Sequence, residues 1–224
     1  MIYADRFDER ENTVLATMTT VEDREVDRFS DVQQGVAMHA VPFRLLPVVF
    51  VVIAGSAIAL AGSPRMFELP DHGALALMLP DGWAAKVSQP PNRLPPTIMM
   101  RPLADAAGEL IVTAVWPIGS ATKVPDEATL RSEVEELAKN ATSQSVERML
   151  PVREIKGVDG RGFYFAATDR APKPGEYKYL TQGIIRVGEI ALAFTVLTND
   201  GQEAVVQTAL KVLRTAAHRP SSLV

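Results

Sequence analysis

The chain has 224 residues, a formal net charge of −4 and no cysteine. The absence of cysteine excludes disulfides, thiolate metal sites, a cysteine nucleophile and a lipidated N-terminal cysteine. Hydrophobic residues make up 47% and charged residues 22% of the chain, a composition typical of folded proteins. The charge is unevenly spread: residues 1–37 hold nine acidic and four basic residues, whereas the part from Gly62 onward has 18 of each. A neutral domain gives no electrostatic reason to expect nucleic-acid binding.

Residues 1–37 are rich in charge and poor in large apolar side chains. This composition predicts a disordered extension, or a segment upstream of the true start codon, which is Met1 or Met38. No function is expected of it.

An uncharged run of 18 residues, LLPVVFVVIAGSAIALAG, follows at Leu45–Gly62. As a helix it would rise about 27 Å at 1.5 Å per residue, which is just enough to cross the core of a bilayer. A buried helix of a soluble domain would normally show a polar face, and this run has none. The run is therefore interpreted as a signal peptide or a membrane anchor.

Small residues at the end of the run favour the signal peptide. Ala59 and Ala61 occupy the −3 and −1 positions of a signal-peptidase site, so that cleavage would leave Gly62 as the first residue. With a start at Met38, residues 38–61 form an ordinary signal peptide and the domain is periplasmic or secreted. With a start at Met1, the run is a single-pass inner-membrane anchor for an exported C-terminal domain. Membrane contact is then expected only through residues 45–62, if they remain uncleaved.

The exported domain comprises residues 62–224. The sequence of its first part predicts short strands. Residues 66–79 form two strands around a Pro-Asp-His-Gly turn, and Asp81-Gly82 makes the next turn. Strands are also predicted at residues 97–103 and 108–116. Both faces of the latter are apolar, which predicts a central strand covered on both sides.

A helix is predicted from Pro125 to about Lys139, with Pro125 in its first position and a C-terminal cap at Asn140. One apolar stripe repeats at helical spacing on its buried face, formed by Leu130, Val134, Leu137 and Ala138.

A four-strand meander and a final helix complete the domain. Asp159-Gly160 and Gly188-Glu189 predict two-residue hairpin turns, the second of type II′. The final helix follows Asn199, with Asp200 as its predicted cap. The segment from His218 onward is expected to be a frayed tail. Two amphipathic helices packed on a mostly antiparallel β-sheet make an α+β layered domain, preceded by one N-terminal hydrophobic helix.

This arrangement resembles the PsbP-like fold. A Pro-x-Gly-Trp turn near the domain start, here Pro80-Asp81-Gly82-Trp83, precedes a mid-chain helix, an antiparallel meander and a terminal helix after FTVLTND. The resemblance covers roughly Phe67 to Ala217. The class includes a photosystem II extrinsic subunit, a nuclear-transport factor and envelope proteins, so the resemblance implies a non-catalytic binding or assembly module. It supplies no catalytic motif.

The sequence predicts no catalytic, cofactor-binding or metal-binding residues. His72 beside Asp71 could act as a base, but an exposed turn pair is the simpler interpretation. Ser120-Ala121-Thr122-Lys123 spells Ser-x-x-Lys without the companion motifs of penicillin-binding enzymes. The aromatic side chains, Trp83 included, are interpreted as core.

One partner-binding patch is predicted, formed by Arg170, Lys173, Tyr177 and Tyr179. The two tyrosines are two residues apart and would share one strand face. The cations lie in the preceding proline-containing loop, where an exported domain could present contacts. The alternative is a pair of half-buried strand tyrosines beside a solvated loop.

Three functions remain open. The first is a non-enzymatic exported protein that binds a protein or an envelope component. The second is a small hydrolase or ligand carrier with a pocket between sheet and helix, which a pocket lined by His72 with a nearby serine or carboxylate would favour. The third is a single-pass, membrane-anchored assembly factor. An exposed Tyr177/Tyr179 face would favour the first.

Overall fold

The computed structural model describes residues 62–91, 94–104, 108–116 and 124–221, which fall in one compact unit spanning Gly55–Val224. The predicted extension at residues 1–37, the apolar run and the residues Ala59 and Ala61 lie outside the described residues, whereas Gly62 opens the first strand. Within the described part of the chain, no helix has the length and apolarity needed to cross a bilayer.

The described residues form ten strands, two α-helices and one 3-10 turn. In chain order they are β1 (Gly62–Leu69), β2 (Gly73–Pro80), β3 (Trp83–Ser88), β4 (Thr97–Pro102), β5 (Gly108–Val115), α2 (Glu127–Ala141), η1 (Thr142–Gln144), β6 (Arg153–Gly157), β7 (Gly160–Thr168), β8 (Tyr179–Val187), β9 (Ile190–Thr198), α3 (Glu203–Arg214) and β10 (Ala217–Arg219).

Seven strands form one sheet in the order β3-β4-β5-β9-β8-β7-β6, and every neighbouring pair is antiparallel. The predicted meander is confirmed, since β6 to β9 lie side by side in sequence order. A second sheet, in the order β1-β2-β10, is also antiparallel. The expectation of a mostly antiparallel α+β fold is therefore confirmed for the described residues.

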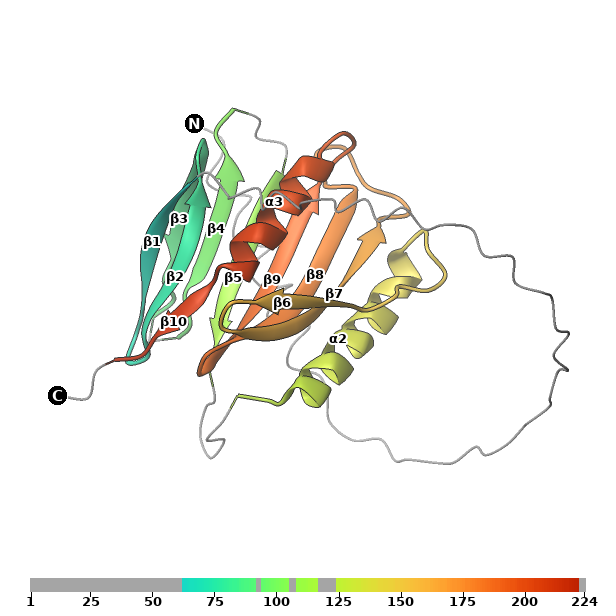
Figure 1. Cartoon of the computed structure of the whole chain (residues 1–224). Helices are drawn as coiled ribbons and strands as arrows, with labels where there is room; N and C mark the ends of the chain where they lie inside the picture. The colour runs from blue at the N-terminus through green and yellow to red at the C-terminus, as the bar shows by residue number, and fades with distance from the viewer. Residues whose placement is uncertain (1–61, 92–93, 105–107, 117–123, 222–224) are drawn as a thin grey trace, which may run out of the picture. The chain divides into compact units, whose positions relative to one another are not determined.

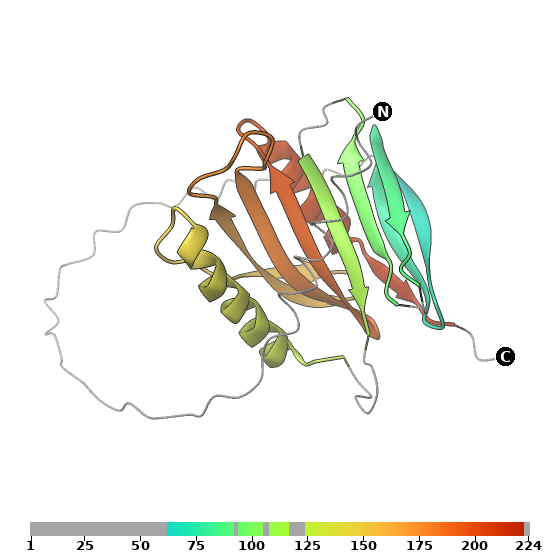
Figure 2. The same ribbon diagram turned by 180° about the vertical axis from the view of Figure 1, so that it is seen from behind.

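The two helices cover opposite faces of the seven-stranded sheet (Figures 1 and 2). α3 and the three-stranded sheet bury one face, where Phe194 of β9 and Leu213 of α3 belong to one hydrophobic core. α2 buries the other face with Val134 against Phe165 of β7 in a second core. Burial of both apolar stripes is the main stabilising contribution, since area removed from water contributes about 25 cal/mol per Å².

The prediction that residues 108–116 are covered on both sides is wrong for the described residues. Leu110 and Val112 of β5 are fully buried on the α3 face, but Ile111 on the other face is only half-buried and Val115 is 37% exposed. The reason is the position of α2, which packs mainly against β7 and β8 at the other end of the sheet.

Three local predictions also need correction. Asp126 lies immediately before α2 and caps the N-terminus of the helix by accepting a hydrogen bond from Thr129 N at 2.8 Å. At the other end of α2, the C-cap is Thr142 and not the predicted Asn140. The β6–β7 turn consists of residues 158–159, because Gly157 pairs with Gly160. The turn at Gly188 is confirmed: Gly188 has a φ of 58° at the first central position, as a type II′ turn requires.

The predicted frayed tail is wrong as well. β10 pairs with β2, and His218 is only 7% exposed. Its Nε2–H donates to the backbone carbonyl of His72 at 2.7 Å, and its backbone N–H donates to Asp159 Oδ2 at 3.1 Å. These partners are distant in sequence, so the local pattern around residue 218 carries no sign of them.

Candidate functional site

The N-terminal end of α3 gathers polar and aromatic side chains from several elements. α3 begins at Glu203 with Gln202 as its N-cap, so the predicted cap at Asp200 is wrong. Asp200 instead accepts hydrogen bonds from the Tyr179 hydroxyl at 2.5 Å and from Lys178 Nζ at 2.9 and 3.0 Å. The ammonium of Lys178 also lies 5.1 Å from the centroid of the Tyr179 ring. We call Lys178, Tyr179 and Asp200 the α3 cluster.

The carboxylate of Asp200 and the ammonium of Lys178 are both held in their charged forms. The hydrogen bond from Tyr179, and then that from Lys178, lowers the pKa of Asp200. The hydrogen bond to Asp200, and then that to Tyr179, raises the pKa of Lys178. The pair is exposed, with 39% of the Lys178 side chain and 71% of the Asp200 side chain accessible, so it contributes little to stability. It orients the Tyr179 ring instead.

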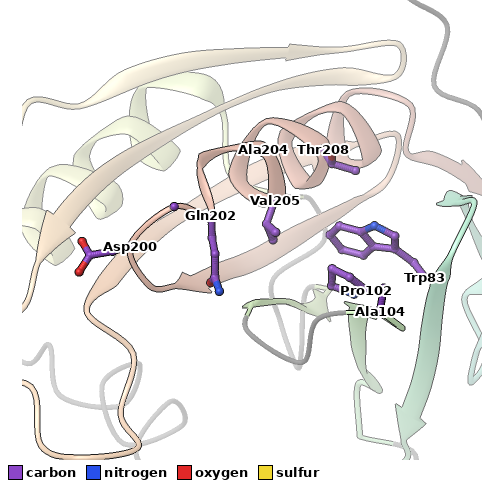
Figure 3. A pocket seen from close by; sticks show the side chains of 9 residues that line it. Trp83, Pro102, Ala104, Asp200, Gln202, Ala204, Val205 and Thr208 are labelled. Carbon is purple, nitrogen blue, oxygen red and sulfur yellow. The ribbon is translucent and has the colours of Figure 1, made fainter.

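A hollow of about 460 Å³, which we call the tryptophan pocket, lies on one side of the cluster between β3 and α3. Figure 3 shows the Trp83 indole beside Pro102 and facing Val205 and Thr208 of α3, while the Asp200 carboxylate points away from the indole. Trp83 is half-buried and packs against the core on the α3 face, so the interpretation of Trp83 as core holds only for part of its side chain. The lining consists of Trp83, Pro102, Ala104, Asp200, Gly201, Gln202, Ala204, Val205 and Thr208.

A second hollow of about 570 Å³ lies along the sheet and α3, and we call it the threonine groove. Its floor includes strand residues of β7, β8 and β9, among them Thr181 and Thr198, and α3 contributes Glu203, Val206 and Gln207. Asp200 lines the tryptophan pocket and Tyr179 lines the threonine groove, so their hydrogen bond joins the borders of the two hollows.

Glu147, at the border of the threonine groove, is held by a network that the sequence does not reveal. Its carboxylate accepts hydrogen bonds from Ser145 Oγ, from Thr168 N at 3.0 Å and from Thr168 Oγ1 at 2.7 Å. Partial burial would raise its pKa, but the hydrogen bonds from Ser145 and Thr168 outweigh it and lower the pKa to about 2. Glu147 is therefore an anion throughout the physiological range.

The structure separates the members of the predicted partner-binding patch. Tyr179 lines the threonine groove, but Tyr177 precedes β8, so the two tyrosines do not share a strand face. The Arg170 guanidinium donates to the backbone carbonyl of Ser145 from Nε at 3.2 Å and from Nη2 at 2.6 Å. Lys173 lies in the exposed loop, where its backbone N–H donates to Glu176. A partner-binding role for these residues stays a prediction.

His72 lines neither hollow. Its ring stacks on Trp116 with centroids 4.3 Å apart and an angle of 27° between the planes. Its neighbour Asp71 has a φ of 64°, in the left-handed turn conformation. Residues 120–123, the Ser-x-x-Lys match, fall in part of the chain that the structure does not describe. In the part that it does describe, no group of three or more His, Asp or Glu side chains is arranged to hold a metal ion.

No protein-family model and no curated protein matches the chain. Two solved structures are similar to it. One is a protein of Bacteroides thetaiotaomicron, with 13% identity and a TM-score of 0.45 over 73% of this chain and 50% of that chain. The chain thus spans half the length of that protein. The other is the cyanobacterial PsbP (CyanoP) of Synechocystis, with 10% identity and a TM-score of 0.47 over 74% of this chain and 96% of that chain. The second structure is a PsbP protein, the class whose fold the sequence resembles.

Proposed function

We propose that the protein is a non-enzymatic exported binding protein whose contact surface is the N-terminal end of α3. The observation that carries the proposal is the half-buried Trp83 in an open pocket beside apolar Val205. Tryptophan is enriched among residues that dominate binding energies, because its large ring buries much apolar area and its N–H can still be satisfied. The charged pair of Lys178 and Asp200 at the border supports specificity more than affinity.

The partner in this proposal is a protein or an envelope component that inserts an apolar side chain into the tryptophan pocket. Export is part of the proposal and rests on the run at residues 45–62, with Gly62 as the first residue after cleavage. If the run is retained, the same surface belongs to a membrane-anchored assembly factor. A ligand carrier is the second candidate, because both hollows lie between the sheet and a helix. A hydrolase based on His72 has no such support, since that ring is stacked on Trp116.

The proposal is tested by photo-crosslinking in cells that express the full chain. A photoreactive residue at position 208, inside the tryptophan pocket, should give a discrete crosslinked product. Trp83→Ala in the same chain should abolish that product while the protein remains folded. A photoreactive residue at position 136, on the exposed face of α2, is the matched control. N-terminal sequencing of the recovered protein distinguishes cleavage before Gly62 from a retained anchor.

The proposed surface would be wrong if position 208 gave no product, or if positions 208 and 136 gave the same products. A product at position 208 that persists in Trp83→Ala would mean that the pocket is near a partner without binding it.

A further inference from the structure

The floor of the threonine groove carries two hydroxyl groups without partners. Thr181 is 5% exposed and Thr198 is 2% exposed, and neither hydroxyl makes a hydrogen bond to any described residue. His218 Nδ1 is the single solvent-inaccessible side-chain N or O atom of the described residues that lacks a partner. The two threonine hydroxyls must therefore reach the space of the groove. Both hydroxyls are therefore available to hydrogen-bond a ligand or water in the groove.

The sheet register places these hydroxyls close together. Tyr179 pairs with Thr198 across β8 and β9, and Thr181 follows Tyr179 on the same face of β8. The Tyr179 ring is fixed by its hydrogen bond to Asp200. Two of the strands that form the floor, β8 and β9, are paired on both sides, whereas β7 pairs with β6 only as far as Tyr164.

The walls of the groove combine apolar side chains, such as Leu180 and Val206, with polar ones, and their charge is close to neutral. Glu147 and Glu203 contribute two carboxylates and Arg153 one guanidinium, a formal sum of −1. That sum disfavours a phosphate group or a polyanion. The remaining polar wall groups include the side-chain amides of Asn199 and Gln207. Hydroxyls and amides both donate and accept hydrogen bonds, which matches a ligand whose own groups do both.

We propose that the threonine groove is a binding site for a neutral oligosaccharide, whose hydroxyl groups bond to Thr181 and Thr198 on the floor. The volume of about 570 Å³ lies within the range of about 300–1,000 Å³ for small-molecule sites. This inference goes beyond the proposed function, because it names a different hollow and a different ligand chemistry. It stands or falls independently of the tryptophan pocket.

The test uses the full chain in a detergent without a sugar headgroup. Maltotetraose, cellotetraose and tetra-N-acetylchitotetraose are titrated by NMR, with inorganic phosphate and triglycine as comparison probes. At least one tetrasaccharide should shift the resonances of Thr181 and Thr198. Thr181→Val and Thr198→Val keep the side-chain shape, and each should weaken binding about fivefold to tenfold, as the loss of one hydrogen bond predicts.

The matched control is Thr195→Val. Thr195 lies on β9 between Phe194 and Val196 and points to the opposite face of the sheet. It should leave the affinity unchanged. Thr181→Val and Thr198→Val should also leave the unfolding temperature unchanged or raise it, which separates ligand binding from a structural role of the hydroxyls.

Three results would overturn the inference. The first is that no tetrasaccharide shifts the groove resonances. The second is that a tetrasaccharide binds but Thr195→Val weakens it as much as the groove variants do. The third is that phosphate or triglycine shifts Thr181 and Thr198 and the sugars do not.

Discussion

Replacing Glu147 by glutamine should remove a pH-dependent part of the stability of this domain. The carboxylate accepts hydrogen bonds from Ser145 and Thr168, and its pKa is lowered from 4.5 to about 2. A carboxyl group with a lowered pKa in the folded state stabilises that state above its unfolded pKa. The contribution is therefore present above about pH 4.5 and is lost as the pH falls toward 2.

The magnitude follows from the pKa difference. The step from 4.5 to about 2 is about 2.5 units, which at 1.36 kcal/mol per unit would amount to about 3.4 kcal/mol. Glu147 is partly exposed, and solvent screening reduces this figure, so we expect a contribution of about 1–2 kcal/mol. Glutamine keeps the size of the side chain and one acceptor oxygen but places an N–H donor at the other position, so it imitates the neutral, protonated carboxyl group.

The assay is urea unfolding of the unsubstituted chain and the Glu147→Gln chain at several pH values from 2 to 7. The difference in free energy of unfolding should be largest above pH 5 and should approach zero near pH 2. Glu136→Gln is the control, because Glu136 is 52% exposed and its nearest cation, Lys139, is 3.8 Å away. A Glu147→Gln difference that is constant with pH, or that grows as the pH falls, would refute the reasoning.

Three further predictions concern the core, the α3 cluster and the cap of α2. Phe165→Ala should lower the free energy of unfolding by about 3–5 kcal/mol, because Phe165 is fully buried, and urea unfolding would show it. Tyr179→Phe should raise the pKa of Asp200 toward its ordinary value in an NMR titration, since the Tyr179 hydroxyl is the main cause of the lowering; an unchanged pKa would contradict the assigned hydrogen bond. Asp126→Ala should lower the temperature of thermal unfolding through loss of the bond from Thr129 N, whereas no loss would mean that solvent replaces the cap.

Much of the fold follows from short-range patterns. The type II′ turn at Gly188 and the meander around it depend on the conformations of neighbouring residues. The apolar stripe of α3 also follows helical spacing, and it includes the buried residues Leu210 and Leu213. These features were predictable because each depends on residues within a few positions of one another.

The sites were less predictable. Trp83 was interpreted as core together with the other aromatic residues, because nothing nearby in sequence indicates the hollow that α3 forms beside it. Thr181 and Thr198 are ordinary strand residues in the sequence. Their hydroxyls become notable only when the sheet register and α3 leave them without a hydrogen-bond partner among the described residues.

The sequence by itself determined the turn at Gly188, the two amphipathic helices and the meander of β6 to β9, because local conformational preference and periodic burial act over short distances. Only the tertiary structure decided that His218 is buried beside His72, that α2 leaves Ile111 half-buried, and that Asp200 binds Tyr179 and does not cap α3. Each of these depends on contacts between segments distant in the chain, whose geometry is set by how sheets and helices pack and not by the residues beside them.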